Sequence, residues 1–178
     1  MKITCTCAAI LFSLHVFAQQ DVVHHFKSII KDTASGFQKF RGERLAVDTS
    51  LPGYYWEDYA SINPVAGTKK NFISFSETII NGGDTTGFNS FSYHAMVADS
   101  LKERMSERLC DEWRDKIVQV MPAGFTVMKY KRNPGNPGKY GWIVRQKLLN
   151  ISITTLPATV QNLNCIWITI SYDGYKTK

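Results

Sequence analysis

Histidine is the side chain used most often for proton transfer near neutral pH, and beyond residue 20 this chain offers only His24, His25 and His94. Adjacent residues on a helix lie about 100° apart around its axis, so His24 and His25 cannot share a metal ion as residues four apart would. We expect both to be exposed in the first turn of a helix, and His94 to cap or pack just ahead of a second helix. The histidines therefore predict no catalytic residue and no metal site, and we expect no cofactor.

The segment Gly83-Asp84-Thr85-Thr86-Gly87 resembles the Asp-Thr-Gly motif of aspartic proteases but departs from it in two respects. It contains an additional threonine, and it occurs once, whereas that reaction needs two carboxylates that share a proton. Glycine and aspartate here predict a hairpin turn. The carboxylates between Glu103 and Asp115 alternate with lysine and arginine at helical spacing, which predicts a solvated helix face with weak ion pairs.

A hairpin between residues 125 and 147 carries the one surface cluster that predicts a binding site, because basic and aromatic residues alternate there. Basic side chains attract anions, and aromatic faces stack on sugars or bases. The candidate ligand-binding residues are Lys129, Lys131, Arg132, Lys139, Tyr140 and Trp142. The alternative is structural, because Trp142 and Val144 share one strand face and lysines on a hairpin protect a sheet from edge pairing. The expected partner is a protein, a glycan or another anionic ligand.

The first residues predict an export signal. Lys2 supplies the positive start, residues 8–17 are mostly apolar but too few to span a bilayer, and Ala18 is a small residue at the expected cleavage position. We therefore expect residues 1–18 to be a signal peptide, residues 19–178 to form a single domain, and the address to be periplasmic or extracellular. An attached N-terminal core helix is the alternative. The ending Ala18-Gln19-Gln20 resembles the cleavage sites of Gram-negative bacterial signal peptides.

Charge and cysteine content narrow the function further. The formal net charge of +6 favours anionic surfaces, but the basic residues do not form the dense stripes of nucleic-acid binders, so nucleic acid is not an expected partner. An oxidising compartment permits a disulfide between Cys110 and Cys165. Against this bond, Cys165 alternates with isoleucines along its strand and points away from the face that a helix would cover. Two buried free thiols are the favoured alternative.

Hydrophobic periodicity predicts an α+β fold. Residues 21–40 and 95–121 have apolar residues at helical spacing, with Leu101, Met105, Leu109, Trp113 and Ile117 expected to face a sheet. Strands are predicted around residues 71–80, 88–93, 125–132, 140–147, 150–156 and 163–172, and residues 51–62 fit either a short strand or an aromatic loop. Strands joined by short turns are antiparallel. The predicted order is one helix, three strands, a second helix and four strands, arranged as a two-layer sandwich with both helices on one face of a mainly antiparallel sheet.

These observations predict a small exported binding domain without enzymatic activity, whose ligand the charge suggests to be anionic. Two alternatives from other classes stay open. One is a secreted hydrolase with a dispersed site, which a cleft holding a histidine beside a carboxylate would favour. The other is an assembly partner of an outer-membrane complex, which a broad apolar patch would favour.

Overall fold

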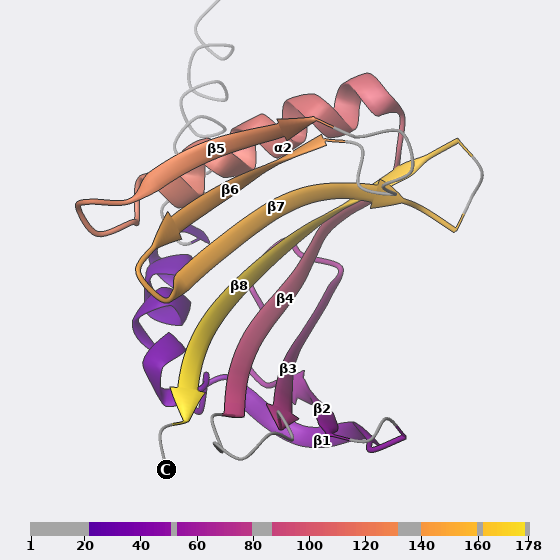
Figure 1. Cartoon of the computed structure of the whole chain (residues 1–178). Helices are drawn as coiled ribbons and strands as arrows, with labels where there is room; N and C mark the ends of the chain where they lie inside the picture. Colours follow the sequence, from indigo (N-terminus) through magenta and orange to yellow (C-terminus); the bar gives the residue numbers. More distant parts are fainter. Residues whose placement is uncertain (1–21, 51–52, 80–86, 132–139, 160–161, 177–178) are drawn as a thin grey trace, which may run out of the picture.

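The computed structural model describes residues 22–50, 53–79, 87–131, 140–159 and 162–176, and it contains a sheet of eight strands with two α-helices (Figure 1). The first helix covers residues 22–31 and is followed by the 3-10 turn η1 (Thr33–Ser35). The remaining elements are β1 (Arg41–Asp48), β2 (Tyr54–Ser61), β3 (Lys70–Ile79), β4 (Gly87–Leu101), α2 (Glu103–Val118), β5 (Thr126–Lys131), β6 (Tyr140–Gln146), β7 (Leu149–Pro157) and β8 (Asn164–Lys176). The α+β class with an antiparallel sheet is confirmed.

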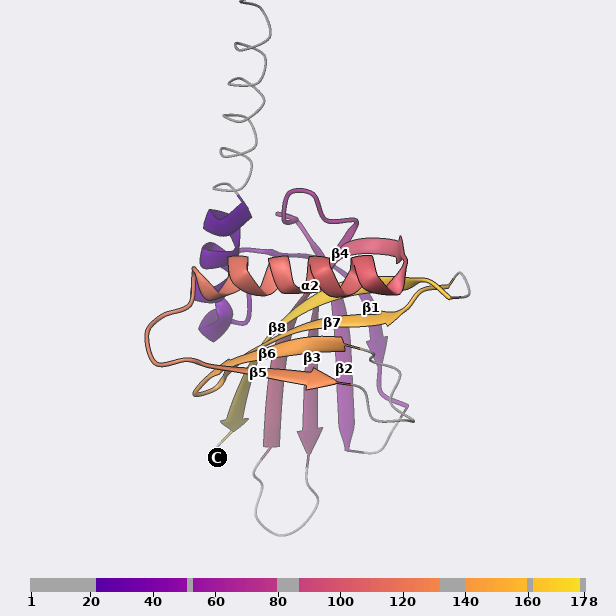
Figure 2. The same cartoon turned by 90° about the horizontal axis from the view of Figure 1, so that it is seen from above.

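The strands lie in the order β1-β2-β3-β4-β8-β7-β6-β5, and every neighbouring pair is antiparallel. Each half of the chain forms a meander, because successive strands are joined by connections too short for a parallel crossover. The second meander runs back toward the first, so the last strand, β8, pairs with β4 and joins the halves at the middle of the sheet (Figures 1 and 2).

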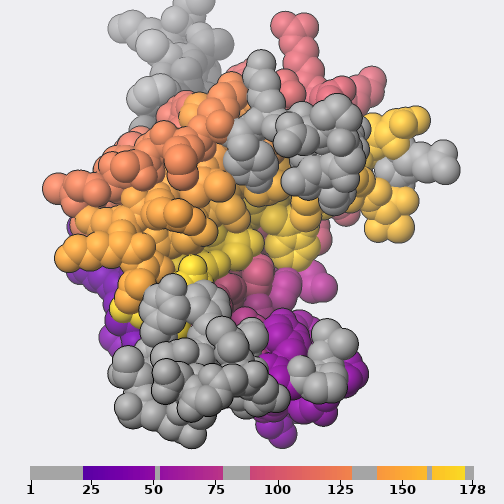
Figure 3. All heavy atoms as spheres, in the orientation of Figure 1, coloured from indigo at the N-terminus to yellow at the C-terminus, as the bar shows by residue number. Residues whose placement is uncertain are grey.

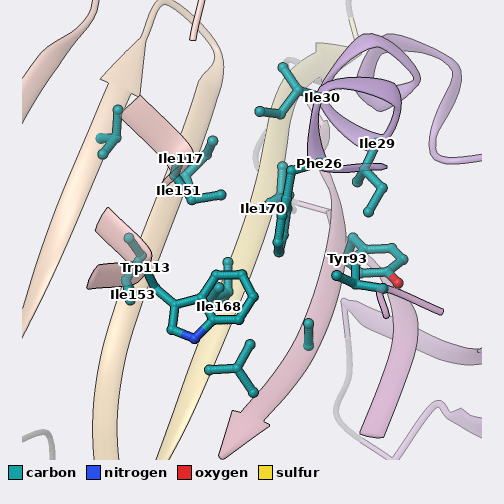
Figure 4. Close-up of a cluster of buried hydrophobic side chains, with 14 of the residues drawn as sticks. Phe26, Ile29, Ile30, Tyr93, Trp113, Ile117, Ile151, Ile153, Ile168 and Ile170 are labelled. Atoms are coloured by element: carbon teal, nitrogen blue, oxygen red, sulfur yellow. The ribbon is translucent and has the colours of Figure 1, made fainter. Parts of the chain in front are cut away.

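The hydrophobic core lies on one face of the central strands. Five isoleucines of β7 and β8 are completely buried, namely Ile151, Ile153, Ile166, Ile168 and Ile170. Phe26 of the first helix packs edge-on against Trp113 of α2, with 5.5 Å between the ring centroids, and both rings belong to the same core (Figure 4). Burial of each of these isoleucine side chains contributes about 1.5–3 kcal/mol to the stability of the fold.

Helix α2 is shorter than the sequence predicts, because β4 continues to Leu101 and the helix begins only at Glu103. Its contact face is therefore formed by Ser106, Cys110, Trp113 and Ile117, which are buried against β6, β7 and β8. The prediction that Met105 faces the sheet is wrong, since its side chain is 59% exposed. The helical spacing of apolar residues continues across the junction between β4 and α2. The prediction therefore assigned residues of the strand, such as Leu101, to the helix.

The predicted helix over residues 21–40 is likewise shorter. Helical spacing continues through Phe37, but Gly36 adopts a left-handed conformation with φ of 70°, which ends the helical segment. A Cβ atom on Gly36 would come within 2.9 Å of the Phe91 ring, so the glycine also permits a close approach to β4. The chain then forms strand β1, which the sequence did not predict, and four strands rather than three precede α2.

The two cysteines of the described residues, Cys110 and Cys165, are free and buried. The Cys110 thiol donates to the Ile153 carbonyl at 3.4 Å, whereas the Cys165 thiol donates to the Leu156 carbonyl at 3.5 Å. The favoured prediction of two buried thiols is confirmed. Within the part of the chain that the structure describes, neither helix has the length and apolar character needed to cross a bilayer. Residues 1–18, the predicted signal peptide, lie outside the described residues, as does the turn at Asp84.

Candidate functional site

The basic hairpin is used, in its described part, to attach helix α2 to the sheet. Tyr140 and Trp142 on β6 both donate hydrogen bonds to Asp111 of α2, at 2.6 Å from the phenol and 2.7 Å from the indole nitrogen. The Lys129 ammonium lies 4.6 Å from the Tyr140 ring centroid and 5.1 Å from that of Trp142, while the Arg114 guanidinium lies 4.2 Å from the Trp142 centroid. These cation–π contacts occupy ring faces that a stacked ligand would need.

The structure thus brings together three of the six candidate binding residues: Lys129, Tyr140 and Trp142. The side chain of Lys131, and Arg132 and Lys139 entirely, lie outside the described residues, so a basic surface at this hairpin stays a prediction. Asp111 has a role that sequence reasoning missed, because its charge was assigned to the solvated helix face. That face is represented by the exposed Arg108–Glu112 pair, with 3.0 Å between nitrogen and oxygen.

A second surface is formed by the side chains that alternate with the core residues along the central strands, and we call it the polar face. One line of directly paired residues crosses β2, β3, β4, β8 and β7 on this face and consists of Asp58, Ser74, Ser92, Ser171 and Asn150. We call this line the serine row. Ser92 and Ser171 share a hydrogen bond at 3.0 Å across the junction of the two meanders. The row therefore continues from one half of the chain into the other.

His94 lies beside the serine row on β4, in the neighbouring line of the polar face. Its Nε2 atom is 2.5 Å from the Ser74 hydroxyl oxygen, and its Nδ1 atom is 3.1 Å from the Thr169 hydroxyl oxygen. A neutral imidazole satisfies both contacts, since one ring nitrogen donates and the other accepts. The expectation that His94 caps or packs at the second helix is wrong, because β4 extends seven residues beyond it, to Leu101.

Burial shifts the protonation equilibria on the polar face. Loss of hydration lowers the pKa of His94 from 6.5 to about 4, so the ring is neutral at physiological pH. Burial also raises the pKa of Asp58, and the positive charge of Lys70 opposes that increase. His94 is thus held in the form that accepts a proton, while the carboxyl group of Asp58 lies in a partly desolvated setting that raises its pKa.

Two acceptor atoms at opposite ends of the serine row have no hydrogen-bond partner. Asp58 Oδ1 and Asn150 Oδ1 are buried, and neither receives a hydrogen bond. A buried polar atom without a partner costs about 1–3 kcal/mol, so such atoms in a folded protein call for an explanation. Two further acceptors among the described residues, Asn89 Oδ1 and Asn164 Oδ1, are also unpartnered. Asn89 alternates with the polar-face residues of β4 and points to the opposite side, and Asn164 is buried beside α2, where its amide donates to Ser106.

Aromatic rings border the serine row. Phe72 stacks on His94 with 4.5 Å between centroids, and Trp167 meets Phe72 edge-on at 5.8 Å. The Lys70 ammonium lies 5.5 Å from the Phe72 centroid. In the space-filling view the molecule is hollowed between the strands of the second meander and those of the first, with β8 visible between them (Figure 3). The polar face therefore combines hydroxyl groups, a neutral imidazole and aromatic edges.

The other two histidines border a separate, shallow pocket of about 230 Å³ between the first helix and the segment before β3. His24 is exposed as predicted, and His25 is half-buried, with its Nε2 atom donating to the Asn63 carbonyl at 3.1 Å. Among the described residues, no three histidine, cysteine or carboxylate side chains lie close enough to hold a metal ion. The described part of the chain therefore offers no cluster for a metal cofactor.

No protein-family model matches the chain, and the searches of curated proteins and of solved structures found no match either. The site must be interpreted from its own geometry. Sequence reasoning missed the polar face because alternating serine and threonine in a strand is the ordinary pattern of a solvated side. The available signal was that Ser74, Ser92 and Ser171 fall at matching positions of three strands that pair in the fold.

Proposed function

We propose that the protein is an exported binding domain without enzymatic activity and that the polar face of its sheet is the ligand-binding surface. We also propose the finer architecture that this requires, a two-layer sandwich whose helices both cover the isoleucine face. The shared core of Phe26 and Trp113 supports it, because one residue from each helix packs into the same cluster. In this arrangement the opposite face of the sheet is left to a ligand.

The observation that carries the proposal is the pair of unpartnered acceptors in the serine row. Asp58 Oδ1 and Asn150 Oδ1 are buried on the same face and lie on β2 and β7, with three strands between them. Partners for these atoms are expected to come from another molecule, because the strand neighbours of both residues already use their backbone groups in the sheet. A ligand that donates hydrogen bonds to both ends of the row would remove both penalties.

The binding proposal is tested by replacing these acceptors in the mature protein. Asp58→Ala and Asn150→Ala remove an atom that is unsatisfied in the free protein, so we expect unchanged or slightly higher stability. Loss of ligand binding without loss of stability would support the polar face. A fall of the denaturant midpoint in both variants would contradict the proposal, because it would show that these atoms stabilise the free fold.

We propose that the protein is exported, because residues 1–18 have the pattern of a signal peptide. The ligand would then be bound in the periplasm or outside the cell. Intact-mass measurement of protein from the periplasm and medium of a Gram-negative host should give a species that begins at Gln19. Recovery of the full-length chain from the cytoplasm alone would contradict export. We also propose that the residues around Lys129 in the basic hairpin bind an anionic ligand. Binding of this kind would be recognised by an affinity that falls as the salt concentration rises.

A hydrolase is the second candidate, and the Ser74–His94 contact specifically favours it. Ser74 Oγ would attack a carbonyl carbon while His94 Nε2 takes the hydroxyl proton and then passes it to the leaving group; water would release the acyl group from the serine. The sheet argues against this reaction. Ser74 lies on an interior strand and pairs with both Asp58 and Ser92, so nearby backbone N–H groups serve the ladders and are not directed at an oxyanion.

A fluorophosphonate probe separates the two candidates, because it phosphonylates activated serine hydroxyls. We expect no labelling of the folded protein at Ser74, in agreement with a binding domain. Peptide mass analysis that finds the probe on Ser74, with labelling abolished in His94→Gln, would overturn the binding proposal in favour of the hydrolase. Ser90, which donates to Asp173 at 2.9 Å on the same face, is the internal control serine.

A further inference from the structure

We propose that the ligand of the polar face is an extended, uncharged saccharide that lies along the serine row. This inference rests on the proposed function and adds the chemical class of the ligand. It is drawn from three properties of the row: the kind of hydrogen-bonding group left free, its length and its charge.

The free groups of the row are acceptors. Asp58 Oδ1 and Asn150 Oδ1 both need a donor, while the serines between them already exchange hydrogen bonds with neighbours, as Ser74 does with His94 and Ser92 with Ser171. A ligand that complements this pattern brings donors at both ends and groups that both donate and accept between them. Sugar hydroxyls have this property, because each is a donor and an acceptor.

The length of the row favours an elongated ligand. Its residues lie on five adjacent strands, and neighbouring strands are about 4.8 Å apart, so the contour from Asp58 to Asn150 is about 19 Å. A single sugar ring cannot reach both unpartnered acceptors. An oligosaccharide of several residues can, and the molecule is hollowed between the two meanders that the row connects (Figure 3).

The charge and the aromatic residues argue against a polyanion on this row, although Lys70 and Arg145 flank its two ends. The row contains one carboxylate and no lysine or arginine, and Arg145, which pairs with Asn150 on β6, is the first basic residue beyond its end. A chain of phosphates or sulfates would therefore meet Asp58 without a compensating cation within the row. Phe72 lies in the line next to the row and Trp167 one line further, and the two rings offer apolar edges to the C–H faces of pyranose rings.

The test is a binding titration of the mature protein against cellohexaose, maltohexaose and chitohexaose, with heparin and a soluble extended peptide as the other ligand classes. We expect at least one neutral oligosaccharide to bind with an affinity that is unchanged between low salt and about 1 M salt, where charge contacts are screened within about 3 Å. Asn150→Ala and Asp58→Ala should each weaken that affinity about ten-fold, which corresponds to the loss of one hydrogen bond.

Asn89→Ala is the matched control, because it removes an equally unpartnered acceptor from the opposite side of β4. It should leave the affinity unchanged. If heparin or the peptide binds, the neutral oligosaccharides do not, and Asn150→Ala still abolishes binding, the saccharide inference is overturned while the polar face keeps its proposed function. If every ligand binds equally well to wild type and to Asn150→Ala, both the saccharide and the polar face are wrong.

Discussion

The burial of His94 predicts a specific dependence of stability on pH. Its pKa is lowered to about 4 in the folded protein, against 6.5 in an unfolded chain, because the imidazolium would lose hydration on the polar face. Above pH 6.5 the ring is neutral in both states and has no effect on the pH dependence. As the pH falls below this value, His94 becomes protonated in the unfolded chain but stays neutral in the folded chain. The free energy of unfolding therefore decreases until the pH reaches the pKa of the folded state.

The size of the loss follows from the difference between the two pKa values. Each pH unit of difference corresponds to about 1.4 kcal/mol, so the full loss below pH 4 is at most about 3 kcal/mol and the loss at pH 5 is about 2 kcal/mol. Urea unfolding of wild type and His94→Gln at several pH values measures it, because glutamine cannot be protonated. Other groups, Asp58 included, are common to both proteins and largely cancel in the comparison.

We expect the stability difference between wild type and His94→Gln to change by about 2 kcal/mol between pH 7 and pH 5, with the wild type losing more. His24→Gln, which replaces an exposed histidine of the first helix, is the control and should follow the wild type. Parallel pH curves for wild type and His94→Gln would refute the buried, neutral imidazole, and with it the electrostatic description of the polar face.

Three further predictions concern packing and reactivity. Ile117→Ala should destabilise the fold by about 2–5 kcal/mol, whereas Met105→Ala, at a side chain that is 59% exposed, should change the urea midpoint little. Asp111→Ala should cost about 1–3 kcal/mol because it leaves two ring donors of β6 without an acceptor, and Asp115→Ala on the exposed side of α2 is its control. Burial raises the pKa of Cys110 to about 12, so iodoacetamide at neutral pH should alkylate it only after unfolding; rapid alkylation of the native protein would contradict its burial.

Most of the sheet could be predicted from the sequence because its strands have strict alternation. Isoleucine occurs at every second position in residues 166–170 and again on the paired strand β7. This alternation predicts strands with one buried face. The junctions could not be predicted in the same way. At Leu101 the apolar spacing of a strand continues directly into that of α2, and at Gly36 a left-handed glycine ends a segment whose apolar residues still have helical spacing.

The candidate site depended on pairing that no local pattern contains. Ser74, Ser92 and Ser171 are separated by many residues in the chain, and only the register of β3, β4 and β8 brings them into one row. His94 was assigned to a helix end because β4 is unusually long. The alternation of basic and aromatic residues in the hairpin, by contrast, was visible in the sequence. The sequence could not show that Trp142 donates a hydrogen bond to Asp111, because Asp111 lies on α2 and only the tertiary fold brings the two residues together.

The central claim is that the polar face is the ligand-binding surface, and amide chemical-shift mapping of the isotope-labelled mature protein tests it most directly. Spectra are recorded with and without the neutral oligosaccharides and heparin. We predict that the largest shifts fall on Ser92, Ser171 and Asn150, in the middle and at the β7 end of the serine row. Shifts confined to the hairpin around Lys129, or a complete absence of shifts with every ligand class, would contradict the account.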